Sequence, residues 1–298
     1  MTKLSVKAPS TCVIIVSFNF ERWIHKCLSS VMTSKLSSTI LVIDNGSNDD
    51  TCEIIKKEYP DVILFETHEN LGFGRANNIG MKYAKEAGFE YLFLLNQDAW
   101  IESDTLDKLI AAAKNNSEYG ILSPVHLNGK GDATDFGFSE YTQLQNREEA
   151  LQLSYEVTEY PFINAAMWLI PVRVIDKVGV FAPIFSHYGE DRNLVHRLLK
   201  KGYKLGLVKS AFGYHDRASR IVNHEQKFYS EYVYFLTEAV NPLYSYPQSI
   251  VYSFFASLKK AIMCMLQKKQ KESREYFKIA LRLIKLQPLI LRTRKDFT

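Results

Sequence analysis

The chain has 298 residues, with 37 lysines and arginines against 33 aspartates and glutamates, for a formal net charge of +4. Its 46% hydrophobic and 13% aromatic residues are enough for a large buried core, which excludes a chain that is disordered throughout. Residues 251–298 carry 12 basic and 3 acidic side chains, so the first 250 residues are net acidic. A basic surface on the folded body is what nucleic-acid binding requires, so we expect no nucleic acid among the partners.

The cysteines and the N-terminal residues indicate a cytosolic protein. The four cysteines lie far apart and form no Cys-x-x-Cys or Cys/His cluster, as is typical of reduced and mostly buried residues. The apolar run at residues 13–16 is too short for the hydrophobic region of a signal peptide. We therefore expect a cytoplasmic location.

Residues 11–125 alternate between short apolar runs and segments of helical periodicity. Strands are predicted at residues 11–17, 40–43, 62–65 and 91–95 and from residue 120, and helices at 21–32, 49–58, 75–87 and 103–115. Continuous apolar strands that alternate with helices are typical of a parallel sheet covered on both faces. The pattern predicts an α/β fold with a Rossmann-like, doubly wound and mostly parallel sheet.

The second half of the chain is less regular. Residues 127–160 are rich in Gly, Asn, Asp and Gln, and we expect loops and antiparallel strands there, with specificity encoded in residues 126–165. Further elements are predicted as a strand at 162–170, helices at 173–178 and 190–201, and a strand at 204–208. Prolines 242 and 247 mark a break, which predicts one domain over residues 1–245 and a basic, amphipathic helical tail over residues 246–298.

Polar side chains follow three of the predicted strands. They are Ser17-Phe18-Asn19, Asp44-Asn45 and Asn96-Gln97-Asp98. Ligands of open α/β sheets bind at the carboxyl ends of the strands. A single Asp or Asn at such a place is more often a helix cap or turn residue, but three in phase favour a site. The carboxylate of Asp98 is suited to a hard divalent cation that also binds phosphate oxygens.

Other candidate residues lie at helix starts and after the last strand. Gly72-Phe-Gly74 lacks a third glycine and follows the third strand, so it is not a dinucleotide-binding loop. Arg75 opposes the dipole of its own helix, which indicates either an anionic ligand or a plain surface arginine. Glu190 and Asp191 either favour the dipole of their helix or include a general base. His215 is either a metal ligand or a satisfied polar residue.

These segments together resemble glycosyltransferase family 2, whose members have a GT-A type fold, and in particular its rhamnosyltransferase-like branch. Nine pieces carry the resemblance in the family's order over about residues 11–220: 13–19, 42–47, 70–80, 94–98, 164–167, 178–181, 188–191, 202–203 and 214–215. The resemblance implies inverting transfer of a sugar from a nucleotide-diphosphate sugar donor to a hydroxyl of a glycan or lipid-linked acceptor. It places the reaction in surface polysaccharide or glycolipid synthesis.

The same resemblance implies a role for each candidate residue. Asp191 would be the catalytic base, with Glu190 beside it to orient the acceptor, and Asp98 and His215 would hold a divalent metal, Mn²⁺ or Mg²⁺. The nucleotide-sugar-binding residues would be Ser17, Asn19, Asp44, Arg75, Asn78 and Asn96. Asn96 replaces the first acid of the family's Asp-x-Asp motif, which removes one charge from the cation site. Two further departures are Asn193, where many relatives have a second Asp after Glu-Asp, and Asp216, where some have a histidine.

The tail has two open interpretations. Apolar residues recur at helical spacing within 251–266 and 276–284, and basic residues surround them. Lys259 and Lys260 split the apolar stretch, which argues against a membrane-spanning helix. Either the helices pack on the main domain with a solvated basic face, or they form a peripheral contact with the inner face of the cell membrane.

Two alternatives to a transferase stay open. A sugar-1-phosphate nucleotidyltransferase shares the α/β layer, but it would carry a glycine-rich phosphate loop after the first strand, where this chain has Ser17-Phe-Asn-Phe20. The second alternative is a non-catalytic protein that binds nucleotides or glycans on the same scaffold. Asn96 and Asn193, which replace acids of the family's motifs, favour this alternative.

Overall fold

The computed structural model describes residues 10–217 and 224–296, which belong to two compact units. The first unit comprises Met1–Lys177 and Lys204–Ala218, and the second comprises Val178–Tyr203 and Ser219–Thr298. The segment 246–298, predicted as a separate tail, lies in the second unit together with two helices that precede it in the chain.

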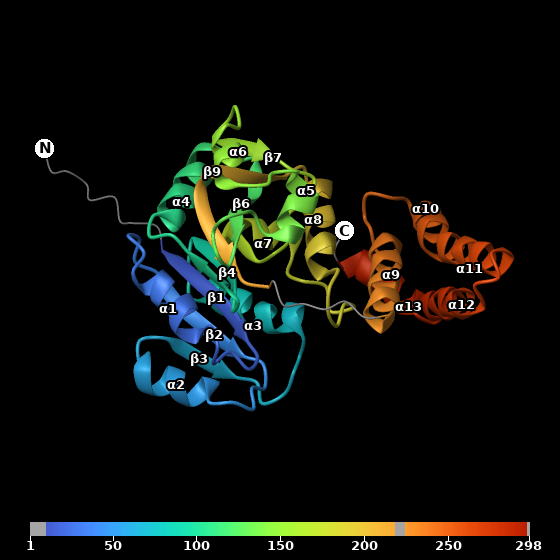
Figure 1. The fold of residues 1–298 in the computed structure, drawn as a ribbon, viewed down its shortest axis with the longest axis horizontal. Helices are drawn as coiled ribbons and strands as arrows, with labels where there is room; N and C mark the ends of the chain where they lie inside the picture. Colours follow the sequence, from blue (N-terminus) through green and yellow to red (C-terminus); the bar gives the residue numbers. More distant parts are fainter. Residues whose placement is uncertain (1–9, 218–223, 297–298) are drawn as a thin grey trace, which may run out of the picture. The chain divides into compact units, whose positions relative to one another are not determined.

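The first unit contains the α/β layer (Figure 1). Its strands are β1 (Thr11–Ser17), β2 (Thr39–Asp44), β3 (Ile63–Glu66), β4 (Tyr91–Asn96), β5 (Ala99–Ile101), β6 (Tyr119–Asn128), β7 (Val157–Glu159), β8 (Met167–Pro171) and β9 (Lys204–His215). Its helices are α1 (Ile24–Met32), α2 (Thr51–Glu58), α3 (Phe73–Glu86), α4 (Thr105–Asn115), α5 (Phe136–Thr142), α6 (Arg147–Leu151) and α7 (Val172–Val178).

The described strands form one sheet in the order β3-β2-β1-β4-β8-β6-β9-β5, with β7 paired to β9. Strands β3, β2, β1 and β4 are parallel, β8 is antiparallel to both β4 and β6, and β6 is parallel to β9. The predicted doubly wound, mostly parallel sheet is therefore confirmed. Its polar strand ends meet at one edge, since Ser17 pairs with Asp44 across β1 and β2, and Val16 with Asn96 across β1 and β4.

Both faces of the sheet are buried. Val13 and Ile15 of β1 share one core with Phe93 and Leu95 of β4 and with residues of α1, α2 and α4. Ile14 points to the opposite face, where α3 approaches so closely that a Cβ on Gly80 would lie 2.5 Å from Ile14 Cγ2. The near-continuous apolar strands are thus explained by burial on two sides.

The irregular region holds more helix than predicted. Residues 127–160 contain α5 and α6 besides the short antiparallel strand β7. Asp135 caps α5, because its carboxylate accepts a hydrogen bond from Phe138 N at 3.0 Å, and Asn146 caps α6 in the same way. Strand β9 is also longer than predicted, running to His215 across a bulge opposite Pro124 and Val125.

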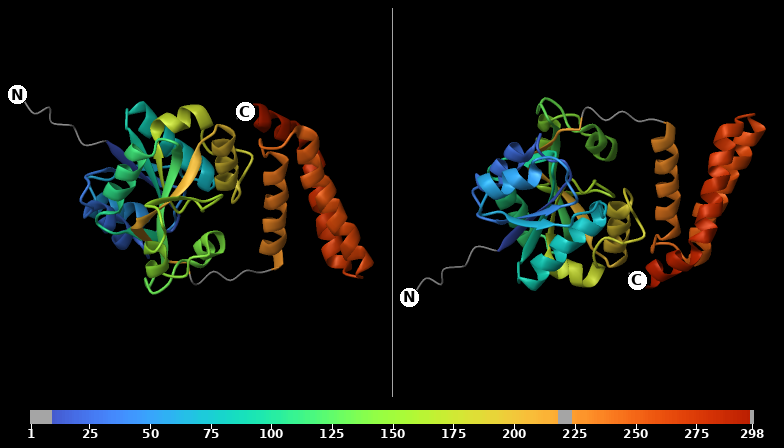
Figure 2. Two further views of the ribbon diagram at one scale, coloured as in Figure 1. Left: turned by 90° about the horizontal axis from the view of Figure 1, so that it is seen from above. Right: turned by 90° about the horizontal axis from the view of Figure 1, so that it is seen from below.

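The regular elements described in the second unit are helices (Figure 2). It contains α8 (Glu190–Lys200), α9 (His224–Ala239), α10 (Tyr246–Ile250), a π-helical turn at Val251–Phe255, α11 (Ala256–Leu266), α12 (Gln270–Lys285) and α13 (Gln287–Asp296). Phe228, Tyr232 and Phe235 of α9 share a core with Tyr276 and Leu283 of α12. The predicted amphipathic tail helices are therefore present, and their buried side joins α9.

The helical stretch Tyr246–Leu266 is continuous and spans 21 residues. Its most apolar window has a mean hydropathy of 1.4 and is 22% buried, so by length and composition it is a candidate membrane-spanning helix. Lys259 and Lys260 lie inside this stretch, as the sequence indicated, and Lys260 pairs with Glu231 of α9 at 2.6 Å.

Candidate active site

The carboxylate of Asp44 organises the ends of β1 and β2. Its Oδ1 accepts hydrogen bonds from the hydroxyls of Ser17, at 3.0 Å, and Ser47, and its Oδ2 accepts from the backbone of Gly46 and Ser47 at 3.2 and 3.0 Å. Asp44 is 3% exposed and Ser17 is fully buried. The side chains of Ser17 and Asp44 are thus in contact. Much of the hydrogen-bond acceptor capacity of the Asp44 carboxylate is used to hold the turn at Gly46 and Ser47.

Asn19 ties that turn to the end of β1. It has a positive φ of 51°, its backbone N–H donates to Ser47 Oγ at 2.9 Å, and its side-chain oxygen accepts from Asn48 N at 2.9 Å. Asparagine adopts this conformation more readily than most residues, which explains its place here. Ser17, Asn19 and Asp44 therefore belong to one hydrogen-bond network at the ends of β1 and β2.

A second turn places helix α3 beside this network. Asn45 donates from Nδ2 to Asn70 Oδ1 at 3.0 Å, and its own Oδ1 accepts from Leu71 N at 2.8 Å. Gly72 is the N-cap residue of α3 and has a φ of 83°. Arg75 and Asn78 lie in the first two turns of α3, with Arg75 exposed and Asn78 half-buried.

Gln97 connects the ends of β1 and β4. Its Oε1 accepts from Phe18 N at 2.7 Å, and its Nε2 donates to Phe18 O at 3.1 Å. The backbone N–H and C=O of Phe18 are therefore both hydrogen-bonded to the side chain of Gln97, which follows the neighbouring strand β4. This contact fixes the distance between the Asp44 network and Asp98, which follows Gln97.

Asp98 and His215 form the closest pair of candidate metal ligands. His215 Nε2 lies 3.2 Å from Asp98 Oδ1, and their side chains are 1% and 11% exposed, respectively. Strand β5 pairs antiparallel with β9, with Ala99 opposite His215, which brings together residues more than a hundred positions apart. Asn96 completes the group: its Nδ2 is 3.5 Å from His215 Nε2, while its Oδ1 is buried without a hydrogen-bond partner.

A buried ion pair lies on the other side of His215. Asp135 Oδ2 is 3.9 Å from His215 Nδ1, and Arg217 binds both Asp135 oxygens at 2.8 and 2.6 Å. Burial alone would raise the pKa of Asp135, but the hydrogen bonds and charge of Arg217 outweigh it and lower that pKa. His126 stands edge-on to His215, and burial lowers its pKa to about 3, so it is a neutral neighbour.

The donor set fits a divalent cation that is shared with a ligand. Among the described residues, no group of three His, Cys, Asp or Glu side chains is arranged as a metal site. The pair Asp98 and His215 nevertheless offers carboxylate oxygen and imidazole nitrogen, and Asn96 Oδ1 is a buried acceptor without a hydrogen-bond partner. Such a partial set suits a metal whose remaining positions are filled by phosphate oxygens and water.

Glu190 and Asp191 lie at the start of α8, in the second unit. Glu190 is 5% exposed and its Oε2 has no hydrogen-bond partner, whereas Asp191 is half-buried. Burial first, and the charge of Asp191 second, raise the pKa of Glu190 from 4.5 to about 8. Glu190 therefore keeps its proton near neutral pH.

Asn193 has a structural role in this helix. Its Oδ1 accepts from Arg197 Nε at 3.1 Å, and the two terminal nitrogens of Arg197 donate to Val178 O and Val180 O at 2.6 and 2.7 Å. The buried Arg197 thereby anchors α8 to the segment before it. An aspartate at position 193 is not needed for this anchoring.

Several residues of the site were missed from the sequence. The sequence motifs assign no role to Gln97, and they do not identify Ser47, Asp135 or Arg217 as members of the site. The helix cap Asp135 carried a local signal, since a capping Asp accepts from the N–H three residues on. Its pairing with Arg217, 82 residues away, had no such signal.

Solved structures share this fold. Staphylococcus aureus TarS, residues 1–349, in complex with UDP-GlcNAc superposes with a TM-score of 0.61 at 16% identity, covering 96% of this chain and 87% of that one. GalNAc-T7 with UDP, GalNAc and Mn²⁺ superposes with a TM-score of 0.58 at 17% identity, over 81% of this chain and 52% of that one. These structures are glycosyltransferases of the GT-A fold, so the predicted fold type is confirmed.

Curated relatives agree with the fold. The N-acetylglucosaminyl-diphospho-decaprenol L-rhamnosyltransferase of Mycobacterium tuberculosis is 24% identical over 251 residues, covering 73% of this chain and 82% of that protein. Glycosyltransferase GlyA of Streptococcus pneumoniae is 33% identical over 100 residues, which are 33% of this chain and only 14% of that protein. The family model "Glycosyl transferase family 2" matches residues 12–179, more than half of the chain. The chain therefore belongs to glycosyltransferase family 2.

Proposed function

We propose that this protein is an inverting, metal-assisted glycosyltransferase. It moves a sugar from a nucleotide-diphosphate sugar to a hydroxyl of a glycan or lipid-linked acceptor during synthesis of a surface polysaccharide or glycolipid. The relatives' names support this reaction class, because they include a rhamnosyltransferase named for a diphospho-decaprenol substrate and a TarS complex with UDP-GlcNAc.

One observation carries the proposal: His215 Nε2 lies 3.2 Å from Asp98 Oδ1. This pair lies at the edge of the sheet where β1 ends at Ser17 and β2 ends at Asp44. Ligands of such sheets bind at this edge. The Asp44 network is suited to bind the nucleoside together with Asn19, Arg75 and Asn78. The diphosphate then lies between that network and Asp98, within reach of Asn96.

A divalent cation, Mn²⁺ or Mg²⁺, would be held by Asp98 and His215. When bound, it supplies positive charge that offsets the charge of a departing nucleoside diphosphate. Asn96 provides a neutral oxygen where an acid would add a negative charge, so we expect weaker metal binding than with two acids. Asp135 lies 3.9 Å from His215 Nδ1, beyond hydrogen-bonding distance, so its contribution is a negative charge beside the imidazole.

Asp191 is the proposed base. Its carboxylate takes the proton of the acceptor hydroxyl while that oxygen attacks the anomeric carbon, and the bond to the nucleoside diphosphate breaks on the opposite face. Glu190 has a raised pKa and keeps its proton at neutral pH, so it can donate a hydrogen bond that orients the acceptor. No covalent enzyme intermediate is needed for a single displacement.

The tail helices give the enzyme a membrane contact in this proposal. Exposed apolar side chains and a net charge of +9 over residues 251–298 favour attachment to an anionic membrane surface. We propose a cytoplasmic enzyme that attaches peripherally to the inner face of the cell membrane, where a lipid-linked acceptor would be available.

The experiment combines donor binding with transfer. A panel of UDP, dTDP and GDP sugars is tested for thermal stabilisation, and the stabilising donor is then used to compare wild type with Asp191→Asn. We expect the variant to bind donor as wild type does and to lose transfer by 100-fold or more. Full transfer by Asp191→Asn would refute the assignment of the base. Release of pyrophosphate from a nucleoside triphosphate and a sugar phosphate would instead indicate a nucleotidyltransferase.

A further inference from the structure

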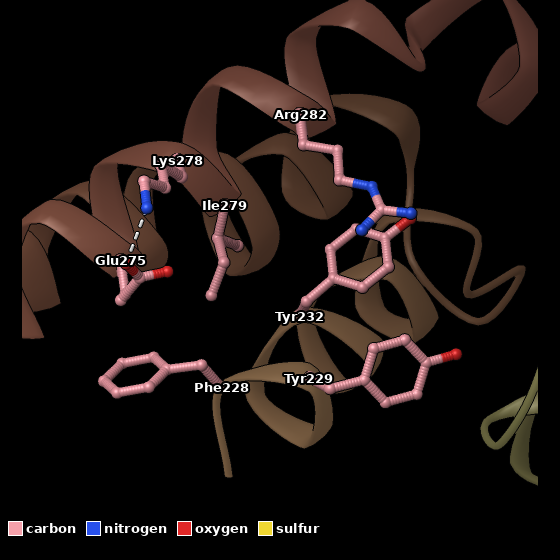
Figure 3. Close-up of a pocket in the computed structure, with 7 residues that line it drawn as sticks. All are labelled: Phe228, Tyr229, Tyr232, Glu275, Lys278, Ile279 and Arg282. Carbon is pink, nitrogen blue, oxygen red and sulfur yellow. Dashed lines mark hydrogen bonds and ion pairs between the residues drawn. The ribbon is translucent and has the colours of Figure 1, made fainter. Parts of the chain in front are cut away.

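A cavity of about 530 Å³ lies between helices α9 and α12 in the second unit (Figure 3). Helix α9 contributes an aromatic wall, and helix α12 contributes one apolar and three charged side chains. The lining residues are Phe228, Tyr229, Tyr232, Glu275, Lys278, Ile279 and Arg282. None of them belongs to the strand-end site or to the Glu190–Asp191 pair, so the cavity has no role in the proposed transfer.

The cations of the cavity are positioned to receive an anion. The Arg282 guanidinium lies over the Tyr232 ring, 3.8 Å from its centroid, and stacking on a ring leaves the edge N–H groups of an arginine available. Lys278 pairs with Glu275 at 2.7 Å, which neutralises the single acid of the lining and uses one of the three N–H donors of the lysine, so the others can reach an anion. Tyr229 is fixed by donation of its hydroxyl to His187 O at 2.8 Å. The lining carries a net charge of +1 that no carboxylate within it balances.

The surface of α12 beside the cavity has two parallel stripes. Five cations recur every three or four residues along the helix: Lys271, Arg274, Lys278, Arg282 and Lys285. Three of them are directly preceded by an exposed apolar residue, namely Phe277, Leu281 and Ile284. Successive residues of a helix are about 100° apart, so an apolar stripe runs alongside the basic one. A free phosphate or nucleotide has no use for the apolar stripe, whereas a lipid has chains to cover it.

We propose that this cavity binds the phosphate group of an anionic phospholipid, with Arg282 and Lys278 as its cationic ligands. The acyl chains lie along Phe277, Leu281 and Ile284, and the aromatic wall of α9 contacts the glycerol region. The site would convert a general electrostatic attraction to the membrane into recognition of individual lipid molecules. The inference rests on the proposed membrane contact but not on the proposed transfer reaction.

The test uses the full chain and soluble short-chain lipids. Calorimetric titration is carried out with dihexanoylphosphatidylglycerol below its micelle concentration, with dihexanoylphosphatidylcholine, and with inorganic phosphate. The pocket variant is Lys278→Gln/Arg282→Gln, and the matched control is Lys271→Gln/Lys285→Gln, which removes the same charge from the same helix outside the cavity. We expect phosphatidylglycerol to bind wild type, the pocket variant to bind it at least tenfold more weakly, and the control to stay within threefold of wild type.

Several outcomes would overturn the proposal. Equal weakening in both double variants would mean diffuse electrostatic attraction, equal binding of inorganic phosphate would mean a free-anion site, and equal binding of phosphatidylcholine would mean that lipid charge is not recognised. A second variant, Ile279→Phe, fills the cavity and keeps every charge, and we expect it to lose phosphatidylglycerol binding as well. Thermal unfolding of each variant establishes that it is folded. Because no donor or acceptor is present, failure here leaves the transferase proposal standing, and an absence of transfer does not affect this result.

Discussion

Replacing Glu190 by glutamine should change how the stability of the protein depends on pH. Glu190 is 5% exposed, and its pKa is raised from 4.5 to about 8 by burial and by Asp191. Between these two values the folded state holds a proton that the unfolded state has lost, so the free energy of unfolding falls as pH rises. This contribution is complete below pH 4.5 and is lost as pH rises towards 8. Glutamine is nearly isosteric with the protonated acid and does not titrate.

The size of this change in the free energy of unfolding follows from the difference between the two pKa values of Glu190. One pKa unit corresponds to about 1.4 kcal/mol, so between pH 5.5 and 7.5 wild type should lose about 2–3 kcal/mol relative to Glu190→Gln. The excess of the variant's unfolding temperature over that of wild type should therefore grow by about 5 °C between pH 5.5 and pH 7.5.

Scanning calorimetry at pH 5.5, 6.5 and 7.5 measures this difference. The matched control is Glu53→Gln, an exposed glutamate in the first turn of α2, for which the difference from wild type should not change with pH. If the difference between Glu190→Gln and wild type is constant over this range, Glu190 titrates as an ordinary carboxylate and the reasoning is wrong.

Two further substitutions test the arrangement of the first unit. Asp135→Asn removes the negative charge between Arg217 and His215, and we expect it to weaken Mn²⁺ binding by about 10- to 100-fold in a metal titration, because the Arg217 cation is then uncompensated beside the metal ligands; unchanged affinity would show that Asp135 acts only as the cap of α5 and the partner of Arg217. Gly80→Ala places a Cβ 2.5 Å from Ile14 Cγ2, so we expect a loss of about 1–3 kcal/mol in the free energy of unfolding by denaturant titration. An unchanged midpoint would mean that α3 moves away from β1 without cost.

The parts of the fold that follow from local pattern were predictable. Buried strands such as β1 and β4 are apolar on both faces, and their ends are marked by polar residues, so the sequence alone was enough to assign Asp44 and Asp98 to one edge of the sheet. Parallel pairing of β1 with both β2 and β4 then brings those ends together. The proximity of His215 to Asp98 could not be predicted from local sequence, because it depends on the antiparallel pairing of β5 with β9.

The remaining parts depend on contacts between distant residues. Helix α5 is only seven residues long and is too short to be stable alone, so its sequence looked like a loop. In the structure Asp135 caps it, and Arg217 passes so close to Gly137 that a Cβ there would lie 1.9 Å from Arg217 Nη2. Neither contact follows from hydrophobic periodicity. The same holds for the cavity between α9 and α12, whose two walls are separated in sequence.

The most direct test of the account measures release of nucleoside diphosphate from the stabilising donor, with acceptor present, in Mn²⁺ and in chelator. Wild type and Asp98→Asn are compared, with the exposed Asp61→Asn as the matched control. The account predicts turnover by wild type and by Asp61→Asn in Mn²⁺ only, with at least 100-fold less turnover by Asp98→Asn. Equal turnover by Asp98→Asn and wild type, or full turnover in chelator, would contradict a metal-assisted transfer at the Asp98–His215 pair.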